Sequence, residues 1–540
     1  MQIDDVPLSD AAAGTWQAIE VERALGRDAA RPEAMAMQHR LGKLSARERI
    51  ARLTDPGSFH EVGALVRSPA FGEAAQPEVP GDGVVSGTGR IAGRPVVVSA
   101  NDFTVMGGSS GKGGGLKTAA LVQRALDHGL PYIVLLDGGG HRIQEGLDSR
   151  HFAAVSSTFQ PLVDLSGWVP MVAAMMGSGF ASPSNMAGLS DFGVMVRKTL
   201  TMGIAGPALV KAATGEDFDK EALGGAAVQA DRNGIADLAV DSDDEALAAI
   251  QRYLSHFPSN AGEPLPIQSC SYPADRRDEA LLTVVPPNSR RAYDVHKVIT
   301  GEIDRDSGFE LKPSYARNVV TMLARLGGRP VGMIANQPMQ MAGTLDSPAC
   351  EKVAHFISVC GAFGLQLVFL VDIPGFLVGG AAERSGLARR SARIIYELGR
   401  ATVPRLSVVL RKGYGLGFIA MNGVLCRPVR NLAHGRDLRH VHRRRRRRGL
   451  PPGDGTGRRP CRQACRAGGG FPRPGQPAGG GTGLRRRRPD RPTRHPPAAD
   501  RDAGSAGAAP THQRPAAQVP RHLAHLKASP HHHERDNHAR

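Results

Sequence analysis

The sequence predicts an α/β fold that is built twice in tandem and is followed by a long basic tail. Two segments, residues 90–101 (RIAGRPVVVSAN) and 325–336 (RLGGRPVGMIAN), are identical at seven of twelve positions. The same shift along the chain carries residues 134–137 (VLLD) onto 369–372 (FLVD) without a gap. Because two independent matches share one offset, they indicate two copies of a unit of ordinary domain size.

Within each copy, short apolar runs alternate with helical stretches. Residues 132–136 and 365–371 are predicted to be buried strands of a mostly parallel sheet. Residues 116–128 and 383–399 have the apolar pattern of helices. Ligands of open α/β sheets bind beyond the carboxyl ends of the strands, so we expect the chemistry in the turns that follow these strands.

The tail differs from the rest of the chain in charge and composition. The 540 residues carry a formal net charge of +17, but residues 424–540 hold 27 Lys plus Arg against 7 Asp plus Glu. Residues 1–423 hold 41 Lys plus Arg against 44 Asp plus Glu, a net charge of −3. The tail has 15 Pro, a single Phe471 and no Ile, Met, Trp or Tyr, so we expect it to be disordered.

Neither a membrane span nor a secretory signal is predicted. The N-terminus is acidic and lacks an apolar core, and the most apolar stretch, residues 356–371, is short and interrupted by glycine. Six scattered cysteines form no CxxC pair, so neither a disulfide framework nor a metal site is expected. A cytoplasmic protein is the expectation.

Four glycine-rich turns are the candidate sites. They are residues 106–115, 137–146, 371–376 and 411–417. Glycine lets a ligand approach the backbone closely, and a turn that enters a helix presents unpaired N–H groups. Such amides can bind a phosphate or the oxyanion of a thioester enolate.

Two familiar patterns in these turns are rejected. Residues 107–111 (GGSSG) match the G-x-S-x-G nucleophile elbow of serine hydrolases, but the glycine run continues to Gly115 instead of forming a strand-to-helix elbow. Gly111-Lys112 resembles a P-loop, but Met106 stands where the first glycine is required and Gly113 follows the lysine.

Residues 39–423 resemble a known family through a series of motifs in order. The motifs are residues 40–50 (RLGKLSARERI), 55–59 (DPGSF), 102–109 (DFTVMGGS), 139–146 (GGHRIQEG), 335–338 (ANQP), 372–376 (DIPGF) and 411–415 (RKGYG). This series is similar to that of the carboxyltransferase (β) subunit of biotin-dependent acyl-CoA carboxylases, of the propionyl-CoA and methylcrotonyl-CoA carboxylase type. The resemblance implies two tandem crotonase-like (ClpP/crotonase) domains, the second truncated.

The domain boundaries follow from the repeat, the resemblance and the composition. We expect an N-terminal extension over residues 1–38, an N-terminal carboxyltransferase domain over 39–270, an incomplete C-terminal carboxyltransferase domain over 271–423 and the tail over 424–540.

The resemblance also implies a mechanism. Carboxybiotin on a separate carrier releases CO2, the freed biotin nitrogen takes a proton from the α-carbon of a short acyl-CoA, and the enolate attacks CO2. Backbone amides hold both oxyanions: those of Gly139 and Gly140 are assigned to the thioester enolate, and those of Leu416 and Gly417 to the biotin carbonyl oxygen.

The expected ligands and partners come from the same resemblance. The acyl-CoA is expected to contact Gly107, Gly108, His141, Gly375 and Phe376, and no metal is required. The partners are a biotin carboxylase and a biotin carboxyl carrier subunit. A homodimer is the smallest active unit, and hexamers are usual.

Three segments depart from the family pattern. His141 stands where alanine is common, and Leu416-Gly417 stands where Gly-Ala is usual. His141 either contacts a polar acyl group or is a solvated or supporting residue. Residues 177–183 (GSGFASP) have fewer glycines than usual, so the identity of the acyl chain stays open.

The tail can be explained as an out-of-frame translation. With free choice of wobble bases, codons for residues 432–453 read one base later spell WPTAEICGMSIEGAVDVAYRR, which looks like the segment that this family has next. We therefore expect a frameshift after about Gly423 and an impaired enzyme. The other readings are a natural linker and a nucleic-acid-binding tail in which residues 443–448 (RRRRRR) contact phosphates.

The function expected is carboxyl transfer from carboxybiotin to the α-carbon of a short acyl-CoA. The alternatives are a biotin-dependent acyl-CoA decarboxylase or transcarboxylase, and nucleic-acid binding through the tail. A hydratase is disfavoured, because that chemistry needs one domain with acid/base carboxylates. Nucleic-acid binding predicts salt-sensitive binding that vanishes when the chain ends at Gly423.

Overall fold

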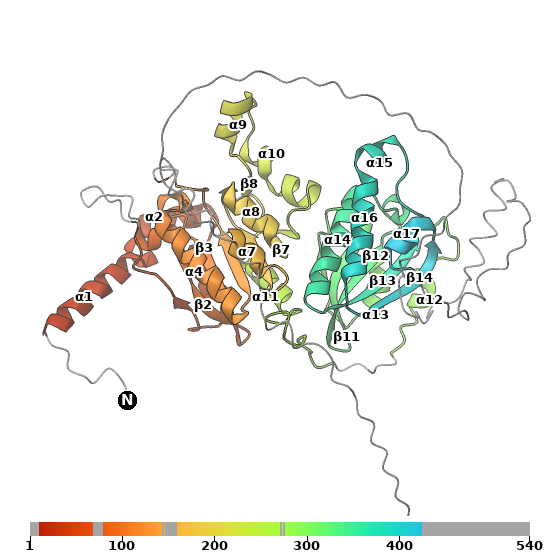
Figure 1. The fold of residues 1–540 in the computed structure, drawn as a ribbon, viewed down its shortest axis with the longest axis horizontal. Coiled ribbons are helices and arrows are strands. Elements are labelled where there is room, and N and C mark those ends of the chain that lie inside the picture. Colours follow the sequence, from red (N-terminus) through yellow and green to blue (C-terminus); the bar gives the residue numbers. More distant parts are fainter. Residues whose placement is uncertain are drawn as a thin grey trace, which may run out of the picture. The chain divides into compact units, whose positions relative to one another are not determined.

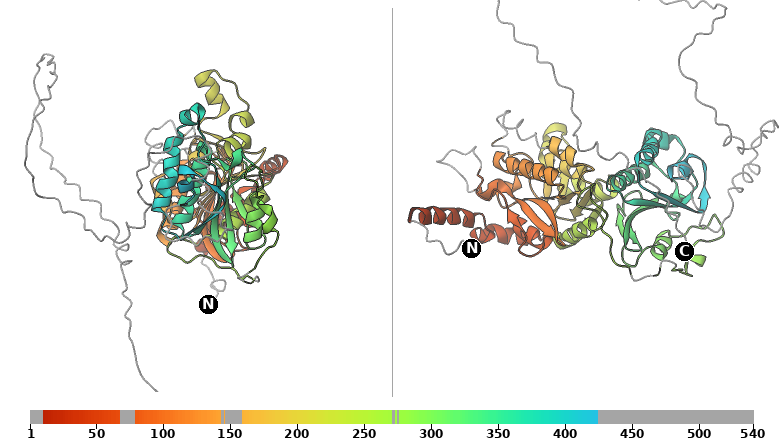
Figure 2. Two further views of the ribbon diagram at one scale, coloured as in Figure 1. Left: turned by 90° about the vertical axis from the view of Figure 1, so that its right-hand side faces the viewer. Right: turned by 60° about the horizontal axis from the view of Figure 1, so that its bottom comes forward.

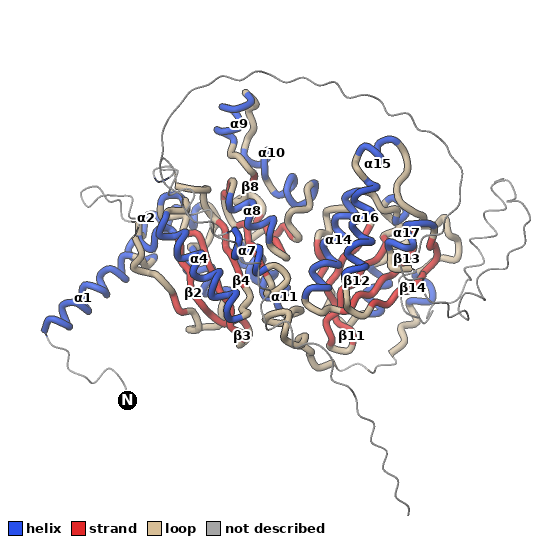
Figure 3. The backbone as a smooth tube through the Cα atoms, viewed as in Figure 1, coloured by secondary structure: helices blue, strands red, loops and turns tan. Residues whose placement is uncertain are grey.

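The structure is a computed structural model that describes residues 10–67, 79–142, 145, 159–270, 273 and 276–423 (Figure 1). The predicted tail, residues 424–540, and the start of the predicted extension, residues 1–9, lie outside the described residues. Within the described part there are two main sheets, flanked by helices (Figure 3), and one small sheet. The predicted α/β class is confirmed.

The strands of the N-terminal half are β1 (His60–Glu61), β2 (Val84–Ile91), β3 (Arg94–Asn101), β4 (Tyr132–Leu136), β5 (Met171–Met175), β6 (Ser178–Phe180), β7 (Phe192–Val196), β8 (Thr201–Gly203) and β9 (Leu238–Val240). Those of the C-terminal half are β10 (Phe309–Leu311), β11 (Val319–Leu326), β12 (Arg329–Asn336), β13 (Gln366–Ile373) and β14 (Arg405–Gly413).

The helices of the N-terminal half are α1 (Asp10–Leu25), α2 (Pro32–Arg40), α3 (Ala46–Leu53), α4 (Lys112–His128), α7 (Phe159–Leu165), α8 (Ser182–Leu189), α9 (Pro207–Thr214), α10 (Lys220–Gly224) and α11 (Asp243–Leu254). Those of the C-terminal half are α12 (Leu281–Val284), α13 (His296–Glu302), α14 (Ser347–Ala362), α15 (Gly380–Arg384), α16 (Leu387–Arg400) and α17 (Gly415–Ala420). Short 3₁₀ helices are η2 (Asp28–Ala30), η3 (Pro80–Gly83), η4 (Met106–Gly108) and η7 (Met341–Gly343). A π-helix, η6, covers Ala227–Arg232.

Each main sheet begins with antiparallel strands and continues with parallel ones. The first sheet has the order β1-β2-β3-β4-β5-β7-β9 and is parallel from β3 onward. The second has the order β10-β11-β12-β13-β14 and is parallel from β12 onward. In Figure 2, α1 projects from the rest of the N-terminal half. The equivalent helices α4 and α14 pack on the hairpins β2–β3 and β11–β12.

The repeat extends from the strands to the turns. Strands β2 and β3 have the same lengths as β11 and β12, and one constant offset relates both pairs of strands and also relates η4 to η7. Even the isolated bridges correspond, since Ser110 pairs with His141 and Leu345 pairs with Phe376. The two halves are therefore copies of one backbone design.

The hairpin turns also share a cap that simple offset matching does not reveal. The Asp55 carboxylate accepts hydrogen bonds from the amides of Ala92 and Gly93 at 2.9 and 2.8 Å. The Asp304 carboxylate accepts from those of Gly327 and Gly328 at 3.0 and 2.7 Å. Asp55 precedes its first partner by 37 positions and Asp304 by only 23, so the first copy contains an insertion between the aspartate and the hairpin turn.

A buried lysine supports each hairpin from its first helix. The Lys117 ammonium on α4 donates to the carbonyl oxygens of Gly81 and Val84, and the Lys352 ammonium on α14 donates to three carbonyls, including that of Val319 at 2.8 Å. No carboxylate hydrogen-bonds either ammonium within the described residues. Burial lowers the pKa of Lys117 to about 8 and that of Lys352 to about 7.

One hydrophobic cluster contains side chains from both halves. The ring centroids of Phe192 and Phe309 lie 5.8 Å apart, and those of Phe257 and Phe363 lie 5.4 Å apart. Beside these rings, the buried Lys312 ammonium lies 3.2 Å from the carboxylate of Asp237. Side chains of both halves therefore form one hydrophobic core. The domain boundary expected at residue 270 stays a prediction.

One predicted helix is interrupted. Residues 383–399 form the end of α15 and most of α16, separated at Ser385 and Gly386. Gly386 has a φ of 73°, a left-handed conformation that an α-helix cannot contain. The predicted strands are confirmed: residues 132–136 are β4, and β13 covers residues 366–373. No helix among the described residues has the length and hydropathy required to cross a bilayer.

We predict that Lys352 makes stability depend on pH. The unfolded chain keeps this proton up to a pKa near 10.5, whereas the folded chain loses it near 7. Between these values the unfolded state binds more protons, so stability rises with pH. The free energy of unfolding in urea is measured for the wild type and for Lys352→Met. From pH 7 to 10, the value for the wild type should rise relative to that of the variant by about 1.4 kcal/mol per pH unit.

The matched control is Lys211→Met. Lys211 forms an exposed ion pair with Asp217 at 2.7 Å, and its side chain is 62% exposed. Because the Lys211 ammonium is exposed rather than buried, Lys211→Met should not reproduce the rise of about 1.4 kcal/mol per pH unit. If the difference in unfolding free energy between the wild type and Lys352→Met does not change with pH across this range, the prediction is wrong.

Candidate functional site

Two of the predicted glycine turns meet at the carboxyl ends of β3 and β4. The Gly139 amide donates to the carbonyl oxygen of Gly107 at 3.1 Å, and the Ser110 amide donates to that of Gly140 at 3.0 Å. Gly108 packs so tightly against Gly138 that a side chain on either would collide with the other's backbone. His141 follows directly, half-buried, in its bridge with Ser110. The structure thus brings together Gly107, Gly108, Gly139, Gly140 and His141.

Within this cluster, two amides remain available to a ligand. Among the described residues, no hydrogen bond is made by the amides of Gly107 and Gly140. The Gly139 amide is occupied by Gly107, and the Gly108 amide donates to Val105 at 2.9 Å. The sequence assigned the donors to Gly139 and Gly140. Of these two amides, that of Gly140 is unoccupied and that of Gly139 is occupied, and Gly107 adds a second unoccupied amide on the adjoining turn.

The helix that follows the first turn is closed to anions, which corrects one expectation. The Lys112 amide at the start of α4 donates to the Glu145 carboxylate at 2.6 Å, and the Gly114 amide donates to the Asp82 carboxylate at 2.9 Å. These carboxylates occupy the positive end of the helix. Two of the amides that enter α4 are therefore occupied, and the adjacent carboxylates disfavour a phosphate or oxyanion there.

Arg142 holds these two carboxylates together. Its buried guanidinium forms ion pairs with Asp82 and, at 2.9 Å, with Glu145. It also donates to the Ser109 carbonyl oxygen at 3.2 Å. The Arg-x-x-Glu spacing in residues 142–145 therefore fixes the loop between the glycine turn and α4.

A buried carboxylate lies behind the second turn. Asp137, the residue after β4, is fully buried and contacts the Lys43 ammonium at 2.6 Å, the Arg49 guanidinium at 2.8 Å and the Gln38 amide at 3.1 Å. Burial lowers the pKa of Lys43, although the Asp137 charge opposes this. Gly177 packs directly on this carboxylate and leaves no space for a side chain.

The C-terminal half repeats the arrangement with different residues. Gly375 follows β13 as Gly140 follows β4, and its carbonyl oxygen accepts from the Leu345 amide at 3.3 Å. Phe376 is partly buried and pairs with Leu345. Gly375 has a φ of 140° and open space beside its Cα, so a ligand can approach the backbone there.

The second pair of predicted donors lies at the start of α17. No hydrogen bond occupies the amides of Gly415, Leu416 and Gly417 among the described residues, as is usual for a first helical turn without a capping side chain. Gly417 packs on Gly375, since a Cβ at Gly417 would lie 3.1 Å from the Gly375 Cα. The third and fourth turns therefore meet, as the first and second do.

Asp372 links these two turns. It is fully buried after β13 and accepts from the Arg411 guanidinium at 2.8 Å and from the Lys412 amide at 3.2 Å. Both cations lie on β14, directly before Gly415. Sequence reasoning quoted Asp137 and Asp372 only as turn residues and missed this role. An aspartate at the end of the equivalent buried strands, β4 and β13, was the available signal.

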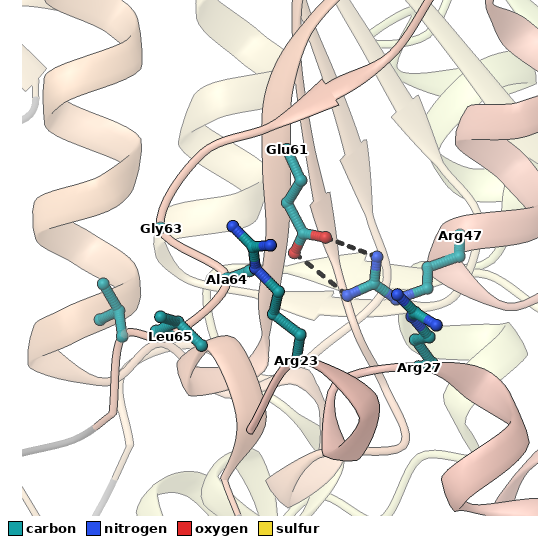
Figure 4. A pocket seen from close by; sticks show the side chains of 8 residues that line it. Arg23, Arg27, Arg47, Glu61, Gly63, Ala64 and Leu65 are labelled. Atoms are coloured by element: carbon teal, nitrogen blue, oxygen red, sulfur yellow. Dashed lines mark hydrogen bonds and ion pairs between the residues drawn. The ribbon is translucent and has the colours of Figure 1, made fainter. Parts of the chain in front are cut away.

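A pocket of the described residues lies elsewhere, beside α1 and β1 (Figure 4). It has a volume of about 560 Å³ and is lined by residues 23, 27, 47, 61 and 63–66. It includes none of the predicted site residues. No cluster of three His, Cys, Asp or Glu side chains suited to a metal ion occurs in the part of the chain that the structure describes.

Two α/β halves that each form backbone turns rich in free amides define a two-domain crotonase-like enzyme. Comparison with known proteins names the class more closely: the chain belongs to the carboxyl transferase domain family, which matches residues 37–434. It is an acyl-CoA carboxyltransferase subunit.

Relatives of known function support this assignment. The chain is 41% identical to the propionyl-CoA carboxylase β chain of Sus scrofa, over 71% of this chain and 72% of the relative. It is also 41% identical to the methylmalonyl-CoA carboxyltransferase 12S subunit of Propionibacterium freudenreichii subsp. shermanii, over 71% and 73%.

Solved structures agree with the fold. A transcarboxylase 12S structure described as a hexamer, with methylmalonyl-CoA bound, is 37% identical with a TM-score of 0.72 and covers 77% of this chain and 80% of its own. A single-chain, multi-domain long-chain acyl-CoA carboxylase is 34% identical with a TM-score of 0.68, over 76% of this chain and 41% of its own.

We predict that Asp137→Asn destabilises the protein strongly although it changes no volume. It leaves the buried cations Lys43 and Arg49 with a single buried carboxylate, Asp243, for partner. Breaking a buried pair in this way costs about 3–5 kcal/mol. The free energy of unfolding in urea measures this loss.

Asp244→Asn is the matched control. Asp244 pairs with Arg52 at 2.6 Å, but both side chains are exposed, by 62% and 48%. Such a pair contributes about 0–1 kcal/mol. Equal costs for the two substitutions would refute the role given to Asp137.

Proposed function

We propose that this chain moves a carboxyl group between carboxybiotin and the α-carbon of a short acyl-CoA, with propionyl-CoA as the first candidate. The propionyl-CoA carboxylase β chains of pig and of Roseobacter denitrificans, 41% and 37% identical, support this acyl group. The observation that carries the mechanism is the pair of unoccupied amides at Gly107 and Gly140 on two touching turns.

This pair binds the enolate oxygen of the thioester. Each such donor is worth about 2.7–4 kcal/mol of transition-state stabilisation when it is preorganised. The preorganisation comes from the Gly139–Gly107 hydrogen bond and from Arg142, which fix the turns from both sides. Gly139 takes part directly only if its amide leaves the Gly107 carbonyl. Gly108 provides the close packing that the turns require.

The amides of Leu416 and Gly417 bind the carbonyl oxygen of biotin, and Gly375 and Phe376 border the same place. Biotin supplies the CO2 and the base when it is bound. Unpaired N–H groups beside an open glycine fit its ureido oxygen, which is a hydrogen-bond acceptor. Leucine instead of glycine at position 416 leaves these donors intact, because they belong to the backbone.

His141 is proposed to contact the acyl group. It follows the Gly140 donor directly and is half-buried, so a polar substituent on the acyl chain would lie within reach of this segment. The alternative is a supporting role for His141 in the Ser110 bridge.

The partners proposed are a biotin carboxylase and a biotin carboxyl carrier subunit, with a homodimer or hexamer of this chain. The relatives named as β chains and the hexameric 12S structure support a multi-subunit enzyme. The cytoplasmic location stays a prediction. A decarboxylase is the second candidate, because the methylmalonyl-CoA decarboxylase α subunit of Veillonella parvula is 40% identical over 71% of this chain.

Residues 424–540 are proposed to be out of frame. The family match ends at residue 434, shortly beyond the expected end at Gly423, and the curated relatives align with 71–77% of the chain. These residues lie outside the described part, and no structural observation favours nucleic-acid binding by the tail.

We predict that restoring the frame restores activity. A frame-corrected chain, supplied with biotinylated carrier and biotin carboxylase, should carboxylate propionyl-CoA, measured as fixation of labelled bicarbonate. The chain as written should be about 100-fold slower or worse, because α17 and its donors lose the segment that follows them and a misplaced donor costs this much.

A chain that stops after Gly423 is the matched control and should be as slow as the chain as written. Full activity of the uncorrected chain would overturn the frameshift proposal. No carboxylation or decarboxylation of any acyl-CoA by the corrected chain would overturn the function.

A further inference from the structure

The short strand β6 borders the turn that offers the Gly140 amide. At the first residue of β6, the Ser178 carbonyl oxygen accepts a hydrogen bond from the Gly138 amide at 2.7 Å. At its last residue, the Phe180 carbonyl oxygen would lie 3.0 Å from a Cβ built on Gly140. The atoms nearest to that Cβ all belong to Phe180 and Ala181. The end of β6 is therefore the immediate neighbour of the Gly140 donor.

The space beside the adjoining glycines is open. A Cβ at Gly107 or at Gly139 would meet no atom within 4 Å among the described residues. A thioester whose oxygen lies at the Gly107 and Gly140 amides can therefore approach from this open side. Where its acyl chain extends past Gly140, it meets the end of β6 and thus Phe180.

The side chain of Phe180 points away from the core of the N-terminal half. Gly179 faces that core, since a Cβ there would lie 2.7 Å from the Met175 methyl carbon. Neighbouring residues of a strand point to opposite faces, so the Phe180 ring lies on the other face. It packs on the two glycines that precede α9: a Cβ at Gly206 would lie 3.4 Å from the ring, and one at Gly203 would lie 3.8 Å from it. Phe180 is half-buried, whereas Met175 is fully buried.

The backbone after Phe180 is strained and held in place by hydrogen bonds. Ala181 has a φ of 61° and a ψ of −110°, a conformation that residues with a side chain rarely adopt. Its amide donates to the Gly203 carbonyl oxygen at 2.9 Å. The Ser184 hydroxyl donates to the Gly179 carbonyl oxygen at 2.9 Å. Strain of this kind persists only where surrounding contacts impose it, and it is concentrated at binding and catalytic sites.

We propose that the Phe180 ring sets the maximum length of the apolar acyl chain of the CoA thioester that binds at Gly107 and Gly140. The inference rests on the proposed function and names a specificity-determining residue for it. The ring rests on glycine backbone and its own backbone is held, so it cannot move aside without disrupting close packing. Phe180 thus acts on apolar length, whereas His141 is proposed to contact a polar substituent.

The consequence of a smaller side chain follows from packing. Methylene groups beyond the length that fits would collide with the ring, and overpacking of this kind weakens binding. Alanine at position 180 would leave a space that three further methylene groups can fill. A single methylene in an apolar site already changes selectivity by about ten-fold or more.

The test is binding, which does not require turnover. The affinities of propionyl-CoA, butyryl-CoA and hexanoyl-CoA are measured by calorimetry for the full wild-type chain and for Phe180→Ala. The ratio of hexanoyl-CoA to propionyl-CoA affinity should rise by about ten-fold or more in the variant. Phe180→Trp enlarges the side chain, so it should lower the ratio of butyryl-CoA to propionyl-CoA affinity. A merely structural role of Phe180 would not reverse the direction of the change between these two variants.

Phe59→Ala is the matched control. Phe59 is also half-buried and also packs on a glycine of a strand, since a Cβ at Gly89 would lie 3.6 Å from its ring. Gly89 lies near the β2–β3 hairpin turn, at the opposite end of the sheet from the glycine turns. Phe59→Ala should therefore leave the affinity ratios unchanged.

Phe180→Leu keeps an apolar side chain on the two glycines and should give a shift between those of wild type and Phe180→Ala. It serves as the readout if the alanine variant fails to fold, as judged by circular dichroism.

The outcomes separate this inference from the function on which it rests. Equal affinity ratios in wild type, Phe180→Ala and Phe180→Leu would overturn the role of Phe180 while leaving the carboxyltransferase assignment intact. An equal loss of affinity for all three thioesters, or the same shift in Phe59→Ala, would also overturn that role. Absence of binding of any of the three thioesters to the wild-type chain would overturn the proposed function as well.

Discussion

The structure depends on a buried carboxylate after the second parallel strand of each half, β4 and β13. Asp137 and Asp372 occupy equivalent places, are fully buried and each contact two cationic side chains. Burying a charged group without an oppositely charged partner costs several kcal/mol. Each aspartate is therefore stable in this position only together with its cationic partners. Each glycine turn begins directly after its aspartate, and its position is therefore set by cations that come from other elements.

The two copies obtain those cations from different places, and this gives them different roles. Asp137 is held by Lys43 and Arg49, which precede the sheet, so the second glycine turn, residues 137–146, is tied to the N-terminal helices. Asp372 is held by Arg411 and Lys412, which lead into α17, so the second carboxylate joins two turns of the same half. One pair of unoccupied amides, Gly107 and Gly140, thus lies after β3 and β4 in the first half. The other pair, Leu416 and Gly417, lies at the start of α17 in the second half.

The elements that could be predicted well from the sequence are those determined by residues close together in the chain. The β2–β3 and β11–β12 hairpins share a Gly-Arg-Pro turn, and β4 has the bounds of its apolar run, because burial on both faces of a parallel strand needs such a run. The glycine turns could be placed for the same reason, because they follow such strands, whereas their role as sites stays a prediction. The break between α15 and α16 at Gly386 could not be predicted, because a helix can contain glycine. Only the left-handed φ of Gly386, which the structure shows, interrupts the predicted helix.

The partners of charged residues were beyond prediction because they are distant in sequence. Asp82 contacts the Gly114 amide 32 residues later, and Glu145 reaches back 33 residues to Lys112. A glycine-rich entry to α4 is typical of an anion site, and only the fold shows that carboxylates already occupy it.

That occupation determines where an anion can bind. A helix N-terminus carries about half a positive charge, and the carboxylates of Asp82 and Glu145 satisfy it at α4. The turn at Gly107 and Gly140 and the first turn of α17 have no carboxylate on their free amides among the described residues. An acceptor oxygen at either place would compete with water rather than with a fixed negative charge. With the entry to α4 occupied by carboxylates, the unoccupied amides that an anion can meet lie at Gly107 and Gly140 and in the first turn of α17.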